Sequence, residues 1–469
     1  MKTLLILNDP PYGTERSYNG LRLAGALAKR VGESVRVFLM GDASACAKSG
    51  QTVPQGFYNL GRMIQVVAQH RGEIGVCGRS SNEVTMPGKT AVVLGGGVGG
   101  LVAANHLRRT LPREDRVILI ERERQHLFQP SLLWLAVGDR RAEQIQRPLD
   151  RLARKGVELV CATVEAIDPA RLVVTAGGRE YAGDALIIAL GAELAPDAIP
   201  GLAAGGHNLY TVDGATAIRD ALRSFRGGRV AILTAAPAYK CPAAPYEAAM
   251  LVDAWFRRHG RRATTELDFY AAEPGPMGVA GPAVSGAVRQ MVESHGVRYH
   301  PEHQVVRVDP AGRELAFANG GVARYDLLIY IPPHRAPAVV RHSGLAPEGG
   351  WIGVDRETFA TKSPGVYAIG DVTTVPLTMG RPLPKAGTFA HRQGEVVAVN
   401  IAAEWSGAEV RHRFTGHGEC FLETGDGRAG FGTGNFYGEP VPQIVLKPPR
   451  RLWHWAKIAF EWKWLRGWF

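Results

Sequence analysis

Short apolar runs alternate with helical spacing of apolar residues at the start of the chain. Between residues 1 and 78 this alternation gives three strand-like runs and two helices, at 3–7, 21–29, 35–39, 60–70 and 74–76. Strands that alternate with helices predict a small parallel α/β unit over residues 1–78. The stretch 79–89 is polar and contains glycine and proline, which indicates a linker.

The next stretch, KTAVVLGGGVGGLVAANHL, predicts a buried strand, a tight turn and a helix. Gly95, Gly97 and Gly100 have the spacing that lets a backbone turn sharply and approach a pyrophosphate at the start of a helix. A second predicted strand ends in Glu121, where an acid can hydrogen-bond a ribose. The pattern favours a dinucleotide site, and a tight turn without a ligand is the alternative.

The rest of the chain predicts two interleaved Rossmann-like domains. The expected boundaries are 90–204 for the first part of one domain, 205–335 for an inserted second domain, 336–400 for the return of the first, and 401–469 for a C-terminal region.

In the return segment a strand runs into Gly370 and Asp371, which places a carboxylate at a strand end. Together with the glycine turn, this segment resembles the flavoproteins that have two dinucleotide-binding domains. The resemblance implies that the chain binds FAD and that Asp371 contacts its ribityl region. Relatives with covalent FAD use cysteines at positions where this chain has none, so the expected FAD is noncovalent.

The second domain lacks the glycine fingerprint that most such flavoproteins use for NAD(P)H. Its corresponding turn contains Cys241, and Glu247 follows at the expected start of a helix. The motif CPAAPYE, together with Cys420 in ECFLETGD, resembles the sulfide:quinone oxidoreductases and the flavocytochrome sulfide dehydrogenases. The resemblance implies that Cys241 and Cys420 form a redox pair, and two independent structural cysteines are the alternative.

Four further residues are candidates for roles at this site, and for Lys385 the role comes from the resemblance of PLPKAGTFAHRQ to the family's helix that starts at the flavin. Glu247 would accept a proton beside the cysteines, unless it only provides charge at a helix start. Lys385 would stabilise charge on the reduced flavin. Phe389 and Phe421 would line a quinone slot, and packing in the core is their alternative.

The N-terminal unit resembles the DsrE-like sulfur-relay family in LLILNDPPYGTERSYNGLRLAGALA and VRVFLMGDA. In that family a cysteine at the end of the third strand carries a persulfide, which implies a sulfur relay at Cys77. The alternative is a small buried residue. Such proteins usually continue for another helix and strand, so this unit is expected to be a shortened one.

Composition and charge narrow the function classes further. The formal charge of +11 increases toward the C-terminal end and favours an anionic surface over a nucleic-acid groove. The five cysteines match neither a disulfide framework nor a metal site. The first residues contain no export signal, and no apolar run is long enough to span a bilayer.

Residues 449–469 contain five of the nine tryptophans, interleaved with basic residues. A helix there would place Leu452, Trp455 and Trp462 on one face, opposite Lys457 and Glu461. Such a segment predicts interfacial insertion, with tryptophans at headgroup depth and basic residues, Lys457 among them, meeting anionic lipid. A helix that docks another subunit is the alternative.

These features predict an α/β flavoprotein with two interleaved Rossmann-like domains, a DsrE-like unit and an amphipathic C-terminal tail. The expected function is oxidation of hydrogen sulfide to sulfane sulfur or polysulfide, with electrons passing through FAD to membrane quinone. The expected location is peripheral, on the cytoplasmic side of a membrane. A sulfane-sulfur acceptor is an expected partner, and a monomer and a homo-oligomer stay open as alternatives. The alternatives are an NAD(P)H-dependent flavin persulfide or disulfide reductase, and a non-enzymatic sulfur carrier with a structural flavin.

Overall fold

The computed structural model describes residues 2–48, 51, 53, 58–77, 88–347, 350–408 and 412–469. The chain forms two compact units: residues 1–89 together with 112–115, and residues 90–111 together with 116–469. Residues 79–87 of the expected linker lie outside the described residues.

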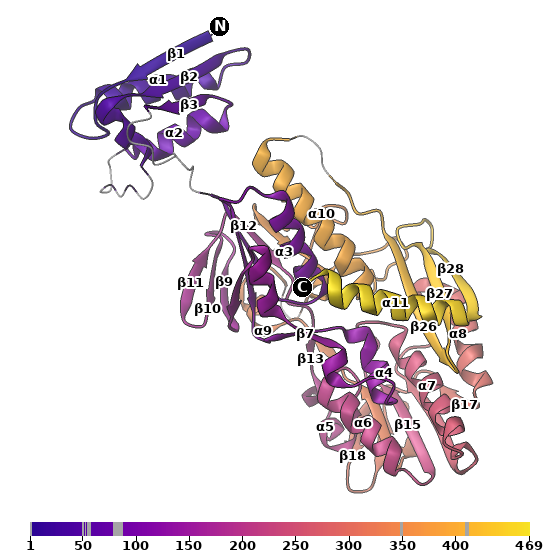
Figure 1. The fold of residues 1–469 in the computed structure, drawn as a ribbon. Coiled ribbons are helices and arrows are strands. Elements are labelled where there is room, and N and C mark those ends of the chain that lie inside the picture. Colours follow the sequence, from indigo (N-terminus) through magenta and orange to yellow (C-terminus); the bar gives the residue numbers. More distant parts are fainter. Residues whose placement is uncertain are drawn as a thin grey trace. The chain divides into compact units, whose positions relative to one another are not determined.

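The N-terminal unit is a three-stranded parallel sheet with two helices (Figure 1). Its elements are β1 (Lys2–Leu7), α1 (Arg16–Ala28), β2 (Ser34–Leu39), α2 (Leu60–Gln69) and β3 (Glu73–Val76). Leu21, Val37 and Ile64 lie in its core because the helices present their apolar faces to the sheet. Cys77 follows the carboxyl end of β3.

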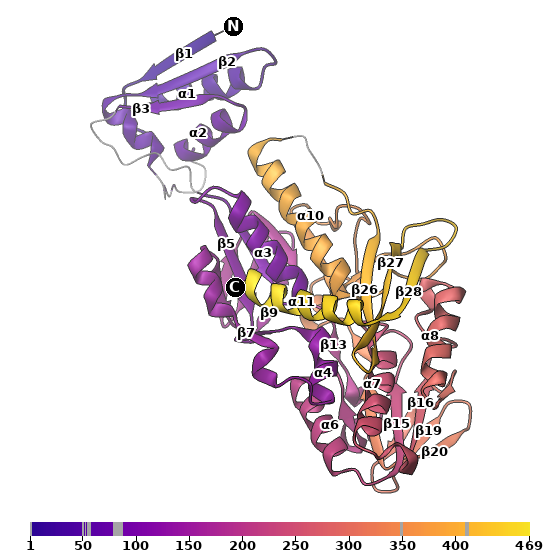
Figure 2. The same ribbon diagram turned by 45° about the vertical axis from the view of Figure 1, so that its right-hand side comes forward.

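The second unit contains a five-stranded parallel sheet around the glycine turn. In spatial order its strands are β24 (Val366–Ala368), β12 (Ala185–Ile188), β4 (Thr90–Leu94), β5 (Arg116–Glu121) and β8 (Glu158–Cys161). Every residue of β4 is buried, as expected for a central strand of a parallel sheet. The helices α3 (Val98–Thr110) and α10 (Gly387–Ser406) pack against each other beside this sheet (Figure 2).

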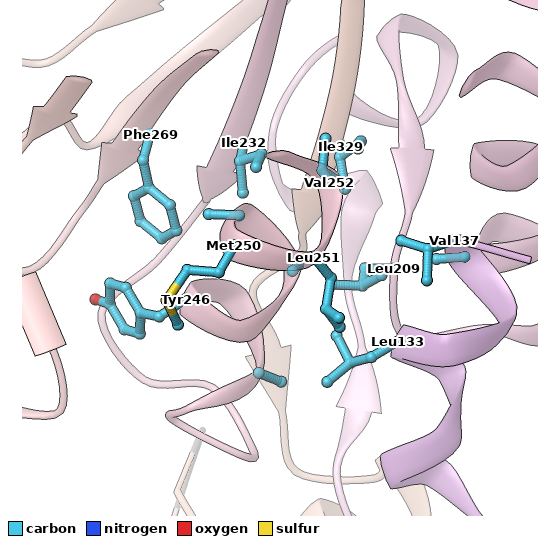
Figure 3. Close-up of a cluster of buried hydrophobic side chains, with 14 of the residues drawn as sticks. Leu133, Val137, Leu209, Ile232, Tyr246, Met250, Leu251, Val252, Phe269 and Ile329 are labelled. Atoms are coloured by element: carbon cyan, nitrogen blue, oxygen red, sulfur yellow. The ribbon is translucent and has the colours of Figure 1, made fainter. Parts of the chain in front are cut away.

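A second five-stranded parallel sheet forms the inserted domain. In spatial order its strands are β14 (His207–Asn208), β21 (Leu327–Ile331), β15 (Gly228–Thr234), β16 (Thr265–Ala271) and β17 (Val297–His300). Helices α6 (Val212–Ser224), α7 (Ala244–Arg258) and α8 (Pro282–Ser294) accompany it. The core between α7 and the sheet includes Tyr246, Met250 and Phe269, and the Tyr246 and Phe269 rings stack at 4.8 Å (Figure 3).

In the sequence, a small antiparallel sheet is inserted between two strands of each Rossmann-like sheet. The first consists of β9 (Val164–Asp168), β10 (Val173–Ala176) and β11 (Arg179–Ala182), and the second of β18 (Val305–Asp309), β19 (Glu314–Phe317) and β20 (Val322–Arg324).

The C-terminal region is an antiparallel sheet followed directly by a helix. Its elements are β26 (His417–Gly425), β27 (Arg428–Asn435), β28 (Gln443–Arg450) and α11 (Arg451–Gly467). The helix runs back from β28 to α3 (Figures 1 and 2), where the Asn105 side chain donates a hydrogen bond to the Trp468 carbonyl at 3.3 Å. The chain end therefore returns to the first Rossmann-like domain.

Large apolar side chains of α11 are exposed, and two of its charged side chains are buried. Leu452, Trp455 and Trp462 are 63%, 65% and 58% exposed, whereas Lys457 and Glu461 are 3% and 6% exposed. The expectation that Lys457 meets lipid headgroups is therefore wrong, because this side chain lies inside the protein. Among the described helices, none combines the length and the apolar character needed to cross a membrane.

Candidate functional site

The glycine turn after β4 requires glycine at two of its predicted positions. Gly95 has a φ of +102°, and a Cβ on it would lie 2.4 Å from the Ala189 carbonyl oxygen. A Cβ on Gly100 would lie 1.9 Å from the Gly95 oxygen, so α3 could not pack as closely on the strand. A Cβ on Gly97 would meet no atom within 4 Å. The turn thus leaves open space at the start of α3, where a pyrophosphate would meet the helix dipole.

Glu121 lies at the end of β5 next to this turn. Its Oε2 accepts a hydrogen bond from the Gly96 amide at 2.5 Å, and its Oε1 accepts one from the Glu123 amide at 2.9 Å. The carboxylate predicted to contact a ribose therefore also organises the glycine turn in this structure.

Gly370 and Asp371 lie at the end of β24 and contribute to a second part of the same site. Together with Lys385, Phe389 and Gln393 they line a cavity. Gly370 has a φ of +73°, and its amide donates a hydrogen bond to the Gln393 side chain at 2.6 Å. Burial raises the pKa of Asp371, although the nearby Lys385 acts in the opposite direction.

Lys385 is held above this cavity by main-chain oxygens. Its Nζ donates hydrogen bonds to the carbonyls of Asp371 at 2.6 Å and Thr373 at 3.0 Å, and it lies 3.5 Å from the centre of the Trp351 ring. Burial lowers the pKa of Lys385 to about 8, and Asp371 opposes this shift. The group can therefore give up a proton near neutral pH more readily than an ordinary lysine.

These two parts fit a flavin dinucleotide. The glycine turn leaves room for a pyrophosphate, and residues that follow β24 line a cavity at the same edge of the sheet. Open parallel sheets bind nucleotides outside the carboxyl ends of their strands, where both parts lie.

Cys241 lies in the turn between β15 and α7. Its backbone adopts a φ of +51°, which is unusual for a residue with a side chain. The Cys241 amide donates a hydrogen bond to the Lys385 carbonyl at 2.7 Å. The Tyr210 hydroxyl donates to the carbonyls of Lys240 at 2.7 Å and Cys241 at 3.2 Å. This turn is thereby tied to the cavity at the end of β24.

Cys420 lies on β26, opposite Gly432 of β27, and a negative charge on Cys241 would raise its pKa. Both cysteines are free thiols. Burial raises the pKa of Cys241 to about 12, and burial together with Cys241 raises that of Cys420 well above its ordinary value. Cys420 is exposed, whereas Cys241 is partly exposed. With these raised pKa values, the reduced cysteines are thiols at neutral pH. A base must remove a proton before either of them can act as a nucleophile.

A buried carboxylate lies beside the cysteine pair. Glu247, in the first turns of α7, accepts hydrogen bonds at Oε2 from the Glu423 amide at 2.8 Å and from Lys457 Nζ at 2.9 Å. Lys457 also lies 3.9 Å from Glu423 Oε1, and Glu423 pairs with His454 at 3.0 Å. Burial raises the pKa of Glu247, and Lys457 acts against that rise. Lys457, Glu423 and His454 were missed by sequence reasoning.

The two predicted quinone residues lie in different surroundings. Phe389 lines the cavity below Lys385 and packs edge-on against Phe436 at 5.0 Å. Phe421 packs against Phe431 at 5.2 Å, and the Phe431 ring stacks on Trp453 of α11 at 4.8 Å. An aromatic series thus leads from the neighbour of Cys420 to the C-terminal helix.

The place of a second dinucleotide, after β15 and β16, is filled by side chains. Glu273 is 9% exposed and accepts hydrogen bonds from the hydroxyls of Tyr239, Tyr246 and Thr234. Tyr239 comes from the very turn in which the glycine fingerprint is missing. The carboxylate at this strand end is consequently satisfied within the protein.

A second link joins α11 to the glycine turn. Trp464 Nε1 donates a hydrogen bond to His126 Nε2 at 3.0 Å, and His126 Nδ1 donates to the Gly96 carbonyl at 2.9 Å. Burial lowers the pKa of His126 to about 4, so the ring is neutral at neutral pH. No local motif marks His126 or Trp464, since they come together only through packing of α11.

Cys77 belongs to the N-terminal unit. It is partly exposed, and its amide donates a hydrogen bond to the Leu39 carbonyl at 2.9 Å. The thiol therefore lies at the carboxyl end of the sheet, as predicted for this strand.

Comparisons with known proteins agree with this arrangement. Residues 1–118 match the DsrE/DsrF-like family, and residues 89–394 match the pyridine nucleotide-disulphide oxidoreductase family. The chain is 27% identical over 364 residues to the mitochondrial sulfide:quinone oxidoreductase of Mus musculus, covering 75% of this chain and 79% of that protein.

Two solved structures are informative. The sulfide:quinone oxidoreductase of Aquifex aeolicus superposes with a TM-score of 0.73 and 25% identity, covering 81% of this chain and 92% of that one. The NAD-dependent persulfide reductase of A. fulgidus shares the fold, with a TM-score of 0.59 and 20% identity, covering 75% of this chain and 65% of that one. With its family match over residues 89–394, the chain belongs to the pyridine nucleotide-disulphide oxidoreductases and is a flavin-dependent oxidoreductase.

Proposed function

We propose that this chain is an FAD-dependent sulfide:quinone oxidoreductase. The support comes most directly from the Cys241 turn, whose amide donates a hydrogen bond to the Lys385 carbonyl and whose thiol interacts electrostatically with Cys420 and with the buried Glu247. The relatives in Mus musculus and Aquifex aeolicus carry the same activity in their names.

In the oxidised protein, Cys241 and Cys420 would form a disulfide. Hydrosulfide attacks one sulfur, a new sulfur–sulfur bond forms, and the bond between the cysteines breaks. One cysteine becomes a persulfide and the other leaves as a thiolate, while Glu247 takes the proton of the attacking group. A further sulfur nucleophile takes the sulfane sulfur and leaves the second cysteine as a thiolate. The two thiolates would then re-form the disulfide and release two electrons, for which bound FAD would be the acceptor and quinone the final one.

The cofactor would be held without a covalent bond. Gly95, Gly97 and Gly100 provide the space for its pyrophosphate, and Glu121 lies where a ribose carboxylate partner is needed. Gly370 and Asp371, which follow β24, would hold the remainder of the cofactor. Lys385, fixed by two carbonyls, would stabilise negative charge that develops on the reduced cofactor.

Aromatic residues would contact both the quinone and the membrane. Phe389 lines the cavity, and the series from Phe421 ends at α11, whose exposed face carries Trp455 and Trp462. Tryptophans with flanking basic residues suit the interface of a membrane with anionic lipid. The protein would thus attach peripherally, on the cytoplasmic side, as a monomer or a homo-oligomer.

The filled second turn argues against an NAD(P)H-dependent reductase. The hydroxyls of Tyr239 and of Tyr246 on α7 reach Glu273 after β16, where a nicotinamide dinucleotide would need a glycine turn and a free carboxylate. Glu273 is already hydrogen-bonded there. Sulfide is therefore the better electron donor.

One anaerobic titration tests the proposed function. The flavin absorbance should bleach with added sulfide, return with added quinone, and stay unchanged with NADH. C161S is the matched control for cysteine variants, because Cys161 is an exposed residue at the end of β8. Bleaching by NADH alone would establish the reductase instead, and a flavin that neither donor reduces would point to a sulfur carrier.

Within this function we assign Cys77 to sulfur relay, as the acceptor of sulfane sulfur. Its thiol is partly exposed at the carboxyl end of β3. Persulfide should appear on Cys77 after turnover with sulfide and fall away in C241S. Full labelling of Cys77 in C241S would contradict the relay.

A further inference from the structure

Lys457 and Glu461 each form an ion pair that attaches α11 to the rest of the second unit. Lys457 Nζ lies 2.9 Å from Glu247 Oε2, with side chains 4% and 3% exposed. Arg140 Nη2 lies 2.8 Å from Glu461 Oε2, with side chains 21% and 8% exposed. Burying an ion costs several kcal/mol, roughly, before its partner is counted, so such pairs are weak explanations of stability. A specific role is therefore worth seeking.

Only the first of these pairs reaches the redox centre. Glu247 follows Cys241 at the start of α7, and Glu423 follows Cys420 on β26. Lys457 contacts both carboxylates, at 2.9 Å and 3.9 Å. One ammonium thus faces the two carboxylates that flank the two cysteines.

Charged and titratable groups from four elements surround Glu247. Cys241 and Tyr210 interact with it from the turn before α7 and the segment before α6, and Cys420 and Glu423 from β26. From α11 come Lys457 in direct contact and His454, which pairs with Glu423.

We propose that Lys457 is a positioning residue of the redox centre, which keeps the Glu247 carboxylate ionised and fixed against β26 so that it can accept a proton beside the cysteines. This inference rests on the proposed function. The geometry supports it, because the Glu423 amide and Lys457 Nζ both bind the same oxygen, Oε2. Burial alone would lower the pKa of Lys457, but Glu247 and Glu423 raise it, which keeps the ammonium charged.

The test compares variants of the two ion pairs in the full-length holoenzyme. The measurement is the rate of flavin reduction by sulfide as a function of pH. In K457Q the acidic limb of the pH–rate profile should shift to higher pH by about one unit or more. The reason is that an opposite charge at the distance of Lys457 from Glu247 lowers a carboxyl pKa by about that amount. The rate on that limb would then fall about tenfold and recover at high pH, and K457R should restore the wild-type profile.

E461Q is the matched control. It breaks the other buried pair of α11 without touching Glu247, so it should lower stability but leave the pH profile in place. E423Q keeps Lys457 and removes the competing carboxylate, which raises the pKa of Glu247. That variant should move the limb downward, and it allows the test even where K457Q folds poorly.

A second readout does not depend on turnover. Infrared spectra of K457Q at neutral pH should gain the carbonyl band of a protonated carboxylic acid, and K457Q/E247Q should lack it. An unshifted profile in K457Q and E423Q, without that band, would overturn the role of Lys457. Should sulfide fail to reduce the flavin in the wild type as well, the proposed function fails, while the infrared comparison still decides on Lys457.

Discussion

The turn after β4 and the turn after β15 occupy equivalent places in their two Rossmann-like domains. The first contains glycines and leaves open space at the start of α3. The second contains Tyr239 and Cys241 and is filled by side chains around Glu273. Since the topology is the same, the residues of the turn alone decide whether this place can bind a dinucleotide or present a thiol.

The largest effect should come from removing the thiol of the second turn. C241S should reduce the rate of flavin reduction by sulfide at least about a thousandfold, as expected for the loss of a nucleophile. Rapid-mixing absorbance measures this rate, and C161S should react like the wild type. A C241S protein that kept the wild-type rate would separate the second turn from the chemistry.

A side chain added to the first turn should weaken FAD binding through steric conflict. In G100A the new Cβ would lie 1.9 Å from the Gly95 oxygen, so we expect the FAD content of purified protein to fall about tenfold. G286A serves as control, because a Cβ on Gly286 in α8 meets no atom within 4 Å. Equal FAD content in both variants would show that the cradle lies elsewhere.

Acid should weaken the first turn through His126, whose pKa of about 4 lies below the ordinary 6.5. As the pH falls, His126 in the unfolded chain takes up a proton at a higher pH than His126 in the folded protein. The contribution of His126 to the free energy of unfolding is therefore fully present above pH 6.5 and is lost as the pH drops toward 4. Between pH 7.5 and 5.0 this one group should cost about 2 kcal/mol of unfolding free energy.

Urea unfolding at both values measures this cost. H126N retains a donor for Gly96, and its stability should fall less over the same interval. His334, with a pKa lowered by burial to about 3, acts in the same direction in both proteins, so the difference isolates His126. Parallel loss in the two proteins would rule His126 out.

The smallest effect concerns the filling of the second turn. Y246F removes one hydroxyl from Glu273 and should lower the free energy of unfolding by about 1 kcal/mol. Flavin content and the rate with sulfide should stay unchanged. Reduction of the flavin by NADH in Y246F would show that the hydroxyl alone had blocked a nicotinamide site.

Local patterns in the sequence predicted the parts of the site that depend on neighbouring residues. The glycine turn is one such part, because spacing within a few residues determines a strand, a turn and a helix. Gly370 and Asp371 could be placed in the same way, at the end of a strand.

The remaining contacts join residues that are far apart in the chain. Glu247 and Lys457 are separated by 210 positions, and Glu247 and Glu423 by 176. Helical spacing in α11 identified two faces but not which of them meets the protein. A polar face normally points to water, and here it is buried because its charges find partners inside the protein, Lys457 with Glu247 and Glu461 with Arg140.

The filled turn after β15 also affects which electron donors could reach a bound flavin. A flavin that accepts electrons from sulfide would lose them, or gain others, if the cell's nicotinamide pool could reach it by the usual entrance. Tyr239 and Tyr246 donate hydrogen bonds to Glu273 at that entrance. In the proposed enzyme these residues would keep nicotinamide cofactors away from the flavin, so that electrons would pass only from sulfide to quinone.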